Sequence, residues 1–77
     1  MGSKYPVLKP QEIIKTLESF GFVLKSQKGS HAKYVKIMIN NPTKTVIIPM
    51  HDEVAKGTLK SILEQAGLTL DEFLDRL

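Results

Sequence analysis

The sequence predicts an α+β domain with the element order α-β-β-β-α and a short additional helix at its C-terminus. Two segments, one beginning near residue 10 and one ending at residue 66, place apolar residues three and four positions apart, as a helix requires. The stretch between them is rich in strand-forming residues and is divided by turn sequences. A three-stranded antiparallel sheet that carries both main helices on one face would bury these apolar sides and leave its other face open.

The first helix is expected to begin at Pro10, because proline suits the first helical position, where its missing N–H costs nothing. Gly21 is a natural helix terminator. The apolar residues of this helix are Ile13, Ile14, Leu17 and Phe20.

Three strands are expected between the helices, at Phe22–Gln27, His31–Ile39 and Thr45–Ile48. The turn Lys28-Gly29-Ser30 separates the first two, and Asn40-Asn41-Pro42-Thr43 makes the last two an antiparallel hairpin. By the period of two in a strand, one face of the second strand carries His31, Lys33, Val35, Ile37 and Ile39.

The second helix follows an irregular stretch from Met50 to about Val54 and ends at Gly67. Its apolar stripe is Leu59, Ile62, Leu63 and Ala66. The short third helix is predicted from a capping-box pattern formed by Thr69 and Glu72, flanked by a hydrophobic-staple pair, Leu68 and Phe73.

Length and composition limit the classes of protein to which the chain can belong. Its 77 residues form one domain, residues 1–77, of the size at which stability is marginal. No apolar run approaches the ~18 residues of a membrane span, so no membrane partner is expected. A secretory signal is not expected either, because the N-terminus lacks an apolar core segment. The absence of cysteine excludes disulfides and is consistent with a protein of the reducing cytoplasm. The two histidines are not spaced as metal ligands are, so no metal or cofactor is expected.

The net charge of +3 is unevenly distributed along the chain. Residues 25–60 carry +5, from seven lysines and two acidic residues, whereas residues 61–77 carry −3, from one arginine and four acidic residues. A basic middle beside an acidic tail indicates a polyanion-binding surface, and a merely solvated lysine-rich surface is the plainer interpretation.

His31 is the sharpest candidate for chemistry, because it follows a Gly-Ser turn and opens a strand, where a ligand can reach it. A neutral imidazole there can take a proton from a ribose 2′-hydroxyl, so that the 2′-oxygen attacks the adjacent phosphate, and the nearby Lys28 and Lys33 can offset the negative charge of the resulting phosphorane. The alternative is a strand-end histidine without chemistry.

A second candidate site, for binding phosphate, is the expected start of the second helix, with Lys56, Gly57, Thr58 and Lys60. Lysine charges are unfavourable near the positive N-terminal end of a helix dipole, and a phosphate bound there would remove this conflict. A solvated helix start is the alternative for this group. Two aromatic residues also have several interpretations. His51 can assist catalysis, bind phosphate or cap the following turn, and an ordinary loop histidine is the plainer interpretation. Tyr34 can stack on a base or belong to the core.

Three sequence pieces occur in a fixed order: a helix that ends in Phe20-Gly21-Phe22, the turn Lys28-Gly29-Ser30-His31, and the run Val46–His51 followed by Lys56–Leu68. Together they resemble the HicA (YcfA-like) toxin family. Gly-Ser-His alone is a weak signal, whereas the joint pattern with the Lys-Gly-Thr-Leu run is specific. The resemblance covers roughly residues 10 to 68, which leaves residues 69–77 as a C-terminal extension.

The resemblance implies a fold similar to that of a double-stranded-RNA-binding domain and a metal-independent mRNA interferase, the toxin of a type II toxin–antitoxin system. It implies cleavage of mRNA with His31 as the catalytic residue, and neutralisation by a HicB-type antitoxin protein that covers this histidine. The extension Thr69–Leu77 is then a candidate for contacts between chains, in a homo-oligomer or with the antitoxin. The residues expected to bind RNA are Lys28, Gly29, Ser30, Lys33, Lys56, Gly57, Thr58 and Lys60.

Two other functions fit the same residues. A non-catalytic module would bind duplex RNA by shape, with strong salt dependence and without strand scission. A protein-interaction domain would instead use its lysines against an acidic partner.

Overall fold

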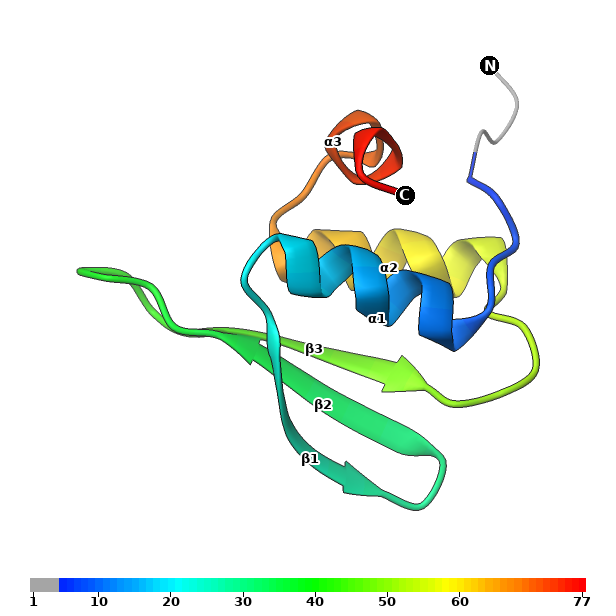
Figure 1. Ribbon diagram of the computed structural model, residues 1–77, viewed down its shortest axis with the longest axis horizontal. Helices are drawn as coiled ribbons and strands as arrows, with labels where there is room; N and C mark the ends of the chain where they lie inside the picture. The colour runs from blue at the N-terminus through cyan, green and yellow to red at the C-terminus, as the bar shows by residue number, and fades with distance from the viewer. Residues whose placement is uncertain (1–4) are drawn as a thin grey trace.

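The predicted α-β-β-β-α order with a further short helix is confirmed by the structure, a computed structural model that describes residues 5–77 (Figure 1). The first four residues of the predicted domain, including Lys4, lie outside the described residues. The elements are α1 (Pro10–Ser19), β1 (Val23–Lys28), β2 (His31–Lys36), β3 (Lys44–Pro49), α2 (Lys56–Ala66) and α3 (Leu70–Asp75).

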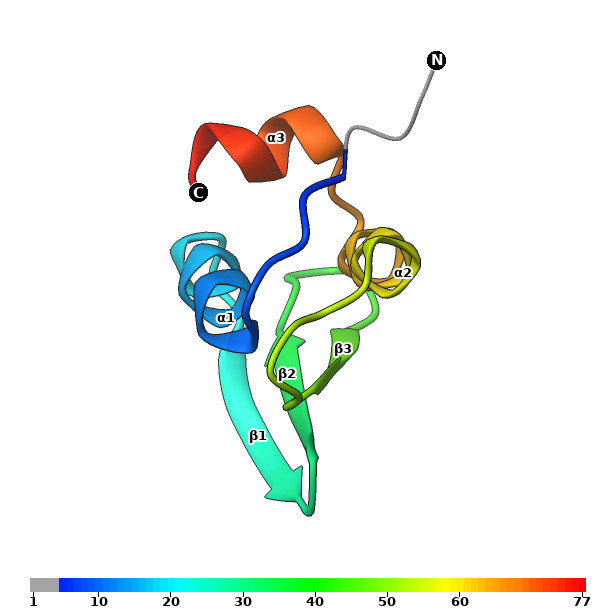
Figure 2. The ribbon, with the colours of Figure 1, turned by 90° about the vertical axis from the view of Figure 1, so that its right-hand side faces the viewer.

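The helices lie in two levels above one face of the sheet. Both views show α1 and α2 side by side on that face, with α3 crossing over them on the side away from the sheet (Figures 1 and 2). Within residues 5–77, no helix reaches the length and apolar character needed to cross a bilayer. The arrangement leaves the second face of the sheet uncovered by helices, as predicted.

The sheet is antiparallel, with β2 in the middle and the strand order β1-β2-β3. Pairing of β2 with β3 is regular from His31 opposite Pro49 to Lys36 opposite Lys44. Pairing of β1 with β2 is interrupted by a bulge between Leu24 and Ser26. The bulge leaves Lys25 as an extra residue in β1.

Residues that pair directly across antiparallel strands share a face, so the register assigns each side chain to one side of the sheet. Ala32 and Tyr34 of β2 and Val46 and Ile48 of β3 are buried against the helices. The other side, which we call the open face, carries Val23, Ser26, Lys28, His31, Lys33, Val35, Thr45, Ile47 and Pro49.

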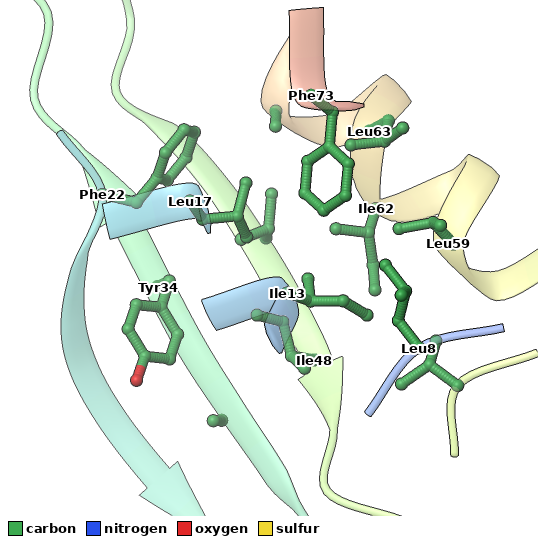
Figure 3. Packing of buried hydrophobic residues seen from close by; sticks show 14 residues of the cluster. Leu8, Ile13, Leu17, Phe22, Tyr34, Ile48, Leu59, Ile62, Leu63 and Phe73 are labelled. Carbon is green, nitrogen blue, oxygen red and sulfur yellow. The ribbon is translucent and has the colours of Figure 1, made fainter. Parts of the chain in front are cut away.

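The core lies between the helices and the helix-covered face of the sheet (Figure 3). The predicted stripe of α2 is buried. In α1, Ile13 and Leu17 are buried and Ile14 is half-buried, whereas Phe20, which was expected in this helix, follows its last residue and is half-buried. Tyr34 belongs to this core, which supports the core interpretation of that residue. The helices begin and end as expected, with Pro10 at the first position of α1 and Gly67 in a left-handed conformation at the end of α2.

The second strand ends at Lys36, so the prediction that it reaches Ile39 was wrong. Ile37 and Ile39 do not share the face of His31 but project from a loop, where 79% and 86% of their surface is exposed. Strand pairing stops at Lys36 because its partner strand begins only at Lys44, after Asn40 takes a positive φ and Pro42 removes an N–H donor. The loop extends away from the helices (Figure 1).

Smaller differences affect the ends of the other strands. The first strand runs from Val23 to Lys28, so Lys28 belongs to the strand and the turn is reduced to two residues. The stretch expected to be irregular contains a bridge, in which the Val54 N–H donates to the Leu8 carbonyl at 2.7 Å. This bridge buries Leu8 and Val54, which were not expected in the core.

The C-terminal helix α3 is part of the folded domain. Its capping box is present as predicted, because the Glu72 N–H donates to Thr69 Oγ1 at 3.1 Å and the Thr69 N–H to Glu72 Oε1 at 2.8 Å. Phe73 is fully buried and points between α1 and α2 (Figure 3). Arg76 donates to the Ser19 carbonyl and lies 4.3 Å from the centre of the Phe20 ring. The extension thus packs on its own chain, whatever contacts it makes with others.

Truncation of Phe73 tests whether α3 is needed for stability. We expect Phe73→Ala to lower the free energy of unfolding by about 3–5 kcal/mol, because it opens a cavity in the core. The exposed neighbour Leu74 provides the control, and Leu74→Ala should cost at most about 1 kcal/mol. Urea unfolding of both variants measures the difference, and equal small effects would show that α3 is dispensable.

The capping box also predicts a dependence of stability on pH. The Thr69 N–H, and then the Thr69 hydroxyl, lower the pKa of the Glu72 carboxyl below its ordinary 4.5. A lowered pKa in the folded state stabilises the protein above pH 4.5, and this stabilisation is lost as pH falls further. The stability difference between the wild type and Glu72→Gln should therefore narrow from pH 7 to pH 3 in urea unfolding. A constant difference would contradict the assignment.

Candidate functional site

The site is built on the tight turn between β1 and β2. Gly29 and Ser30 are its two central residues, and Lys28 pairs with His31 across its base. Gly29 has a φ of 58°, whereas Ser30 has a negative one, which matches a type II′ turn with glycine at the first central position. This turn holds the first residue of β2 at the end of the sheet.

His31 is the first residue of the middle strand and lies on the open face, exposed to solvent. Because β2 is central, His31 has a neighbour on each side, Lys28 on β1 and Pro49 on β3. A ligand can therefore reach the imidazole from the open face without any opening of the core.

Lys33 lies two residues farther along the same strand and face, between Ser26 and Ile47. The side chains of Lys28 and Lys33 are both exposed. The structure thus brings together five of the predicted site residues, on one hairpin: Lys28, Gly29, Ser30, His31 and Lys33.

A second histidine joins this group. The Met50 N–H donates to the Ser30 carbonyl at 2.6 Å, which fastens the segment after β3 to the turn. His51 follows, and its ring centre lies 6.5 Å from that of His31, with the two ring planes at 67°. No sequence pattern pairs these residues, which are 20 positions apart. The signal that could have found the pair is the β2–β3 register, which places Pro49 opposite His31.

A hollow of about 350 Å³ also borders His51. It is formed where the start of α1 meets the segment after β3, and it has one cationic and one anionic side chain in its wall, Lys9 and Asp52. Its other lining residues are Pro10, Gln11, Met50 and His51. His51 therefore lies next to both the His31 ring and this hollow, and its side chain is exposed.

The second predicted group lies at the start of α2, as expected, but in a different part of the molecule. Lys56, Gly57 and Lys60 are exposed and Thr58 is half-buried. The helix has no acidic residue in its first turn and no side-chain cap on Ala55. This helix start lies in the helix layer, on the opposite side of the sheet from the open face and from Lys33 (Figure 2). The β1–β2 turn and the start of α2 nevertheless lie at the same end of the molecule (Figure 1).

Among residues 5–77, no three side chains of histidine, cysteine, aspartate or glutamate are grouped so that they could hold a metal ion. The one tyrosine on β2 does not reach the open face, since Tyr34 is buried against the helices. Its burial, and then the nearby Glu18 carboxylate, raise the pKa of Tyr34 above 10.0. The exposed basic side chains at the turn are thus those of Lys28, His31, Lys33 and His51, and the Asp52 carboxylate lies in the hollow next to His51.

Comparison with known protein families gives a match over most of the chain. The family model described as the HicA toxin of bacterial toxin–antitoxin systems matches residues 10–68. No curated protein sequence matches significantly. The family match covers the turn, His31, His51 and the start of α2, and it stops before α3.

Two glycines of the predicted site, Gly29 and Gly57, differ in backbone conformation, because only Gly29 has a positive φ. Substituting alanine at each of them tests the effect of this difference on stability. At both Gly29 and Gly57, a Cβ added to the backbone would have no atom within 4 Å, so a methyl group meets open space. We expect Gly29→Ala to cost about 1 kcal/mol, because its φ of 58° is unfavourable for alanine. Gly57→Ala should instead stabilise α2 by up to about 1 kcal/mol. Urea unfolding compares the two, and effects of the same sign would contradict this backbone assignment.

Proposed function

The chain belongs to the HicA toxin family of bacterial toxin–antitoxin systems, and from this membership and the surroundings of His31 we propose that it is an endoribonuclease that cleaves mRNA. The observation that carries the proposal is an exposed imidazole at the end of the sheet with Lys28 paired beside it and Lys33 on the same face. Cleavage of mRNA would inhibit translation, which is a direct way for a small protein to act as a toxin.

In the proposed reaction, His31 removes the proton of a ribose 2′-hydroxyl. The 2′-oxygen then forms a bond to the adjacent phosphorus, and the bond from phosphorus to the 5′-oxygen of the next nucleotide breaks. Lys28 and Lys33 offset the negative charge that develops on the phosphate oxygens. Once the leaving 5′-oxygen has gained a proton, the products are a 2′,3′-cyclic phosphate and a free 5′-hydroxyl. No step needs a metal ion.

The lysines explain how the RNA would be held. The backbone phosphates of one strand can lie along the open face over Lys33 and Lys28 and pass His31 at the end of the sheet. To reach Lys56 and Lys60 as well, the same RNA strand must bend around the end of the sheet toward the helix layer (Figure 2). A flexible single strand bends in this way more readily than a duplex does.

The same geometry suggests how activity is controlled. Membership in a toxin–antitoxin family implies an antitoxin partner. We propose a HicB-type protein that covers His31 and presents acidic residues to Lys28 and Lys33, since opposite charges speed the association of such partners.

The proposal is tested by incubating the purified protein with single-stranded RNA in the presence of EDTA. We expect the wild type to cleave the RNA and His31→Ala to be slower by at least about 10²-fold, the usual contribution of a general base. Lys15→Ala, an exposed residue on α1 away from the turn, serves as the control and should cleave normally. Gel electrophoresis of end-labelled RNA measures the rates.

Three results would contradict the proposal. Equal cleavage by the wild type and His31→Ala would remove this histidine from the reaction. Loss of wild-type cleavage in EDTA would exclude a metal-free reaction. Tight, salt-sensitive binding of duplex RNA without any scission would favour the non-catalytic binding module instead.

A further inference from the structure

Two imidazoles lie within reach of one phosphate group, whereas removal of the 2′-hydroxyl proton uses only one of them. We propose that His51 is a second catalytic residue, which donates the proton that the leaving 5′-oxygen needs. This inference rests on the proposed function and adds to it the group that completes the proton transfers.

The distance between the rings supports this role. Their centres are 6.5 Å apart, and the planes are inclined at 67° instead of being stacked. Proton transfer requires hydrogen bonds of about 2.6–3.2 Å from ring nitrogen to oxygen. A gap of 6.5 Å leaves room for two such bonds to the oxygens of a single phosphodiester, and it is too small for a whole nucleotide to separate the rings.

The fold holds His51 at this distance even though it lies outside any strand. Pro49 is paired with His31 in the sheet, and the Met50 N–H donates to the Ser30 carbonyl, next to His31, at 2.6 Å. Both constraints act within two residues of His51, so the backbone from which this side chain extends is tied to the backbone of the turn. The side chain itself stays exposed.

The hollow beside His51 gives the leaving part of the RNA a place to lie. His51 and Lys9 both line it, and the Lys9 ammonium can attract a phosphate of the RNA. If the attacking ribose lies at His31 and the leaving nucleotide in the hollow, the two imidazoles would lie on opposite sides of the phosphorus. In-line displacement at phosphorus requires this placement of the attacking and leaving oxygens.

The proton transfers balance with two histidines in opposite protonation states. Neutral His31 gains the 2′-hydroxyl proton as the bond from the 2′-oxygen to phosphorus forms. Protonated His51 gives up a proton to the 5′-oxygen as the bond from phosphorus to that oxygen breaks. After one turnover, His31 is protonated and His51 is neutral, and exchange of protons with water restores both.

A substrate with a better leaving group separates this role from simple phosphate binding. A bond that the wild type cleaves is first mapped, and an RNA is then synthesised with sulfur in place of the bridging 5′-oxygen at that bond. A thiolate leaves without protonation because thiols are much more acidic than alcohols. A general acid is therefore needed for the oxygen substrate and dispensable for the sulfur one.

We expect His51→Ala to slow cleavage of the oxygen substrate by about 10²–10⁴-fold and to change cleavage of the sulfur substrate by less than about 10-fold. His31→Ala should slow both, since both need the attacking 2′-oxygen. His51→Gln keeps a polar side chain without an acidic proton and should behave as His51→Ala does. Circular dichroism of each variant checks that the fold is unchanged.

The possible failures are distinguishable. Equal slowing of both substrates by His51→Ala would make His51 a binding or positioning residue and overturn this inference, as would normal cleavage of both. In either case the proposed nuclease stands. Absence of cleavage of any RNA by the wild type would instead overturn the proposed function and this inference with it.

Discussion

The pairing of β2 with strands on both sides is the constraint on which the rest of the site depends. It requires a continuous apolar side, which Ala32 and Tyr34 supply on β2 and Val46 and Ile48 on β3, all buried beneath the helices. Because strand residues alternate in direction, burial of these four commits His31 and Lys33 to the opposite face. The chemistry of the open face is thus set by the packing of the other face, and the segment carrying His51 is brought to the turn by the same pairing.

The features that could be predicted from the sequence are those determined by residues close together in the chain. Pro10, Gly67 and the pair Thr69–Glu72 act within one helical turn, and the structure places each of them as predicted. The turn at Gly29 is equally local. The end of β2 was misplaced because strand propensity continues through Ile39 whereas pairing does not, and pairing depends on where a distant segment begins. The neighbour of His31 is set by that register too, so His51 could not be assigned to the site from its own surroundings in the sequence.

A domain of this size needs apolar residues from nearly every segment to form a core. Here the core includes residues on both sides of the stretch that matches the family model, since Leu8 precedes it and Phe73 follows it. Leu8 bridges to Val54 beside the start of α2, and Phe73 fills the space between the two main helices. The helices that cover the sheet are therefore themselves held by segments outside the matching region, while the turn, His31 and Lys33 keep free access to solvent.

The bulge in β1 has a consequence for comparing this chain with its relatives. Lys25 is the extra residue, and beyond it Ser26 pairs with Lys33 and Lys28 with His31 in unbroken register. A deletion at position 25 would straighten the strand and leave those two pairs unchanged. Because the turn holds Lys28 opposite His31, a deletion of Ser26 or Gln27 would instead bring Lys25 opposite Lys33. When homologous sequences are aligned, gaps in this strand should therefore be placed at position 25, so that the lysine before Gly-Ser-His stays paired with the histidine.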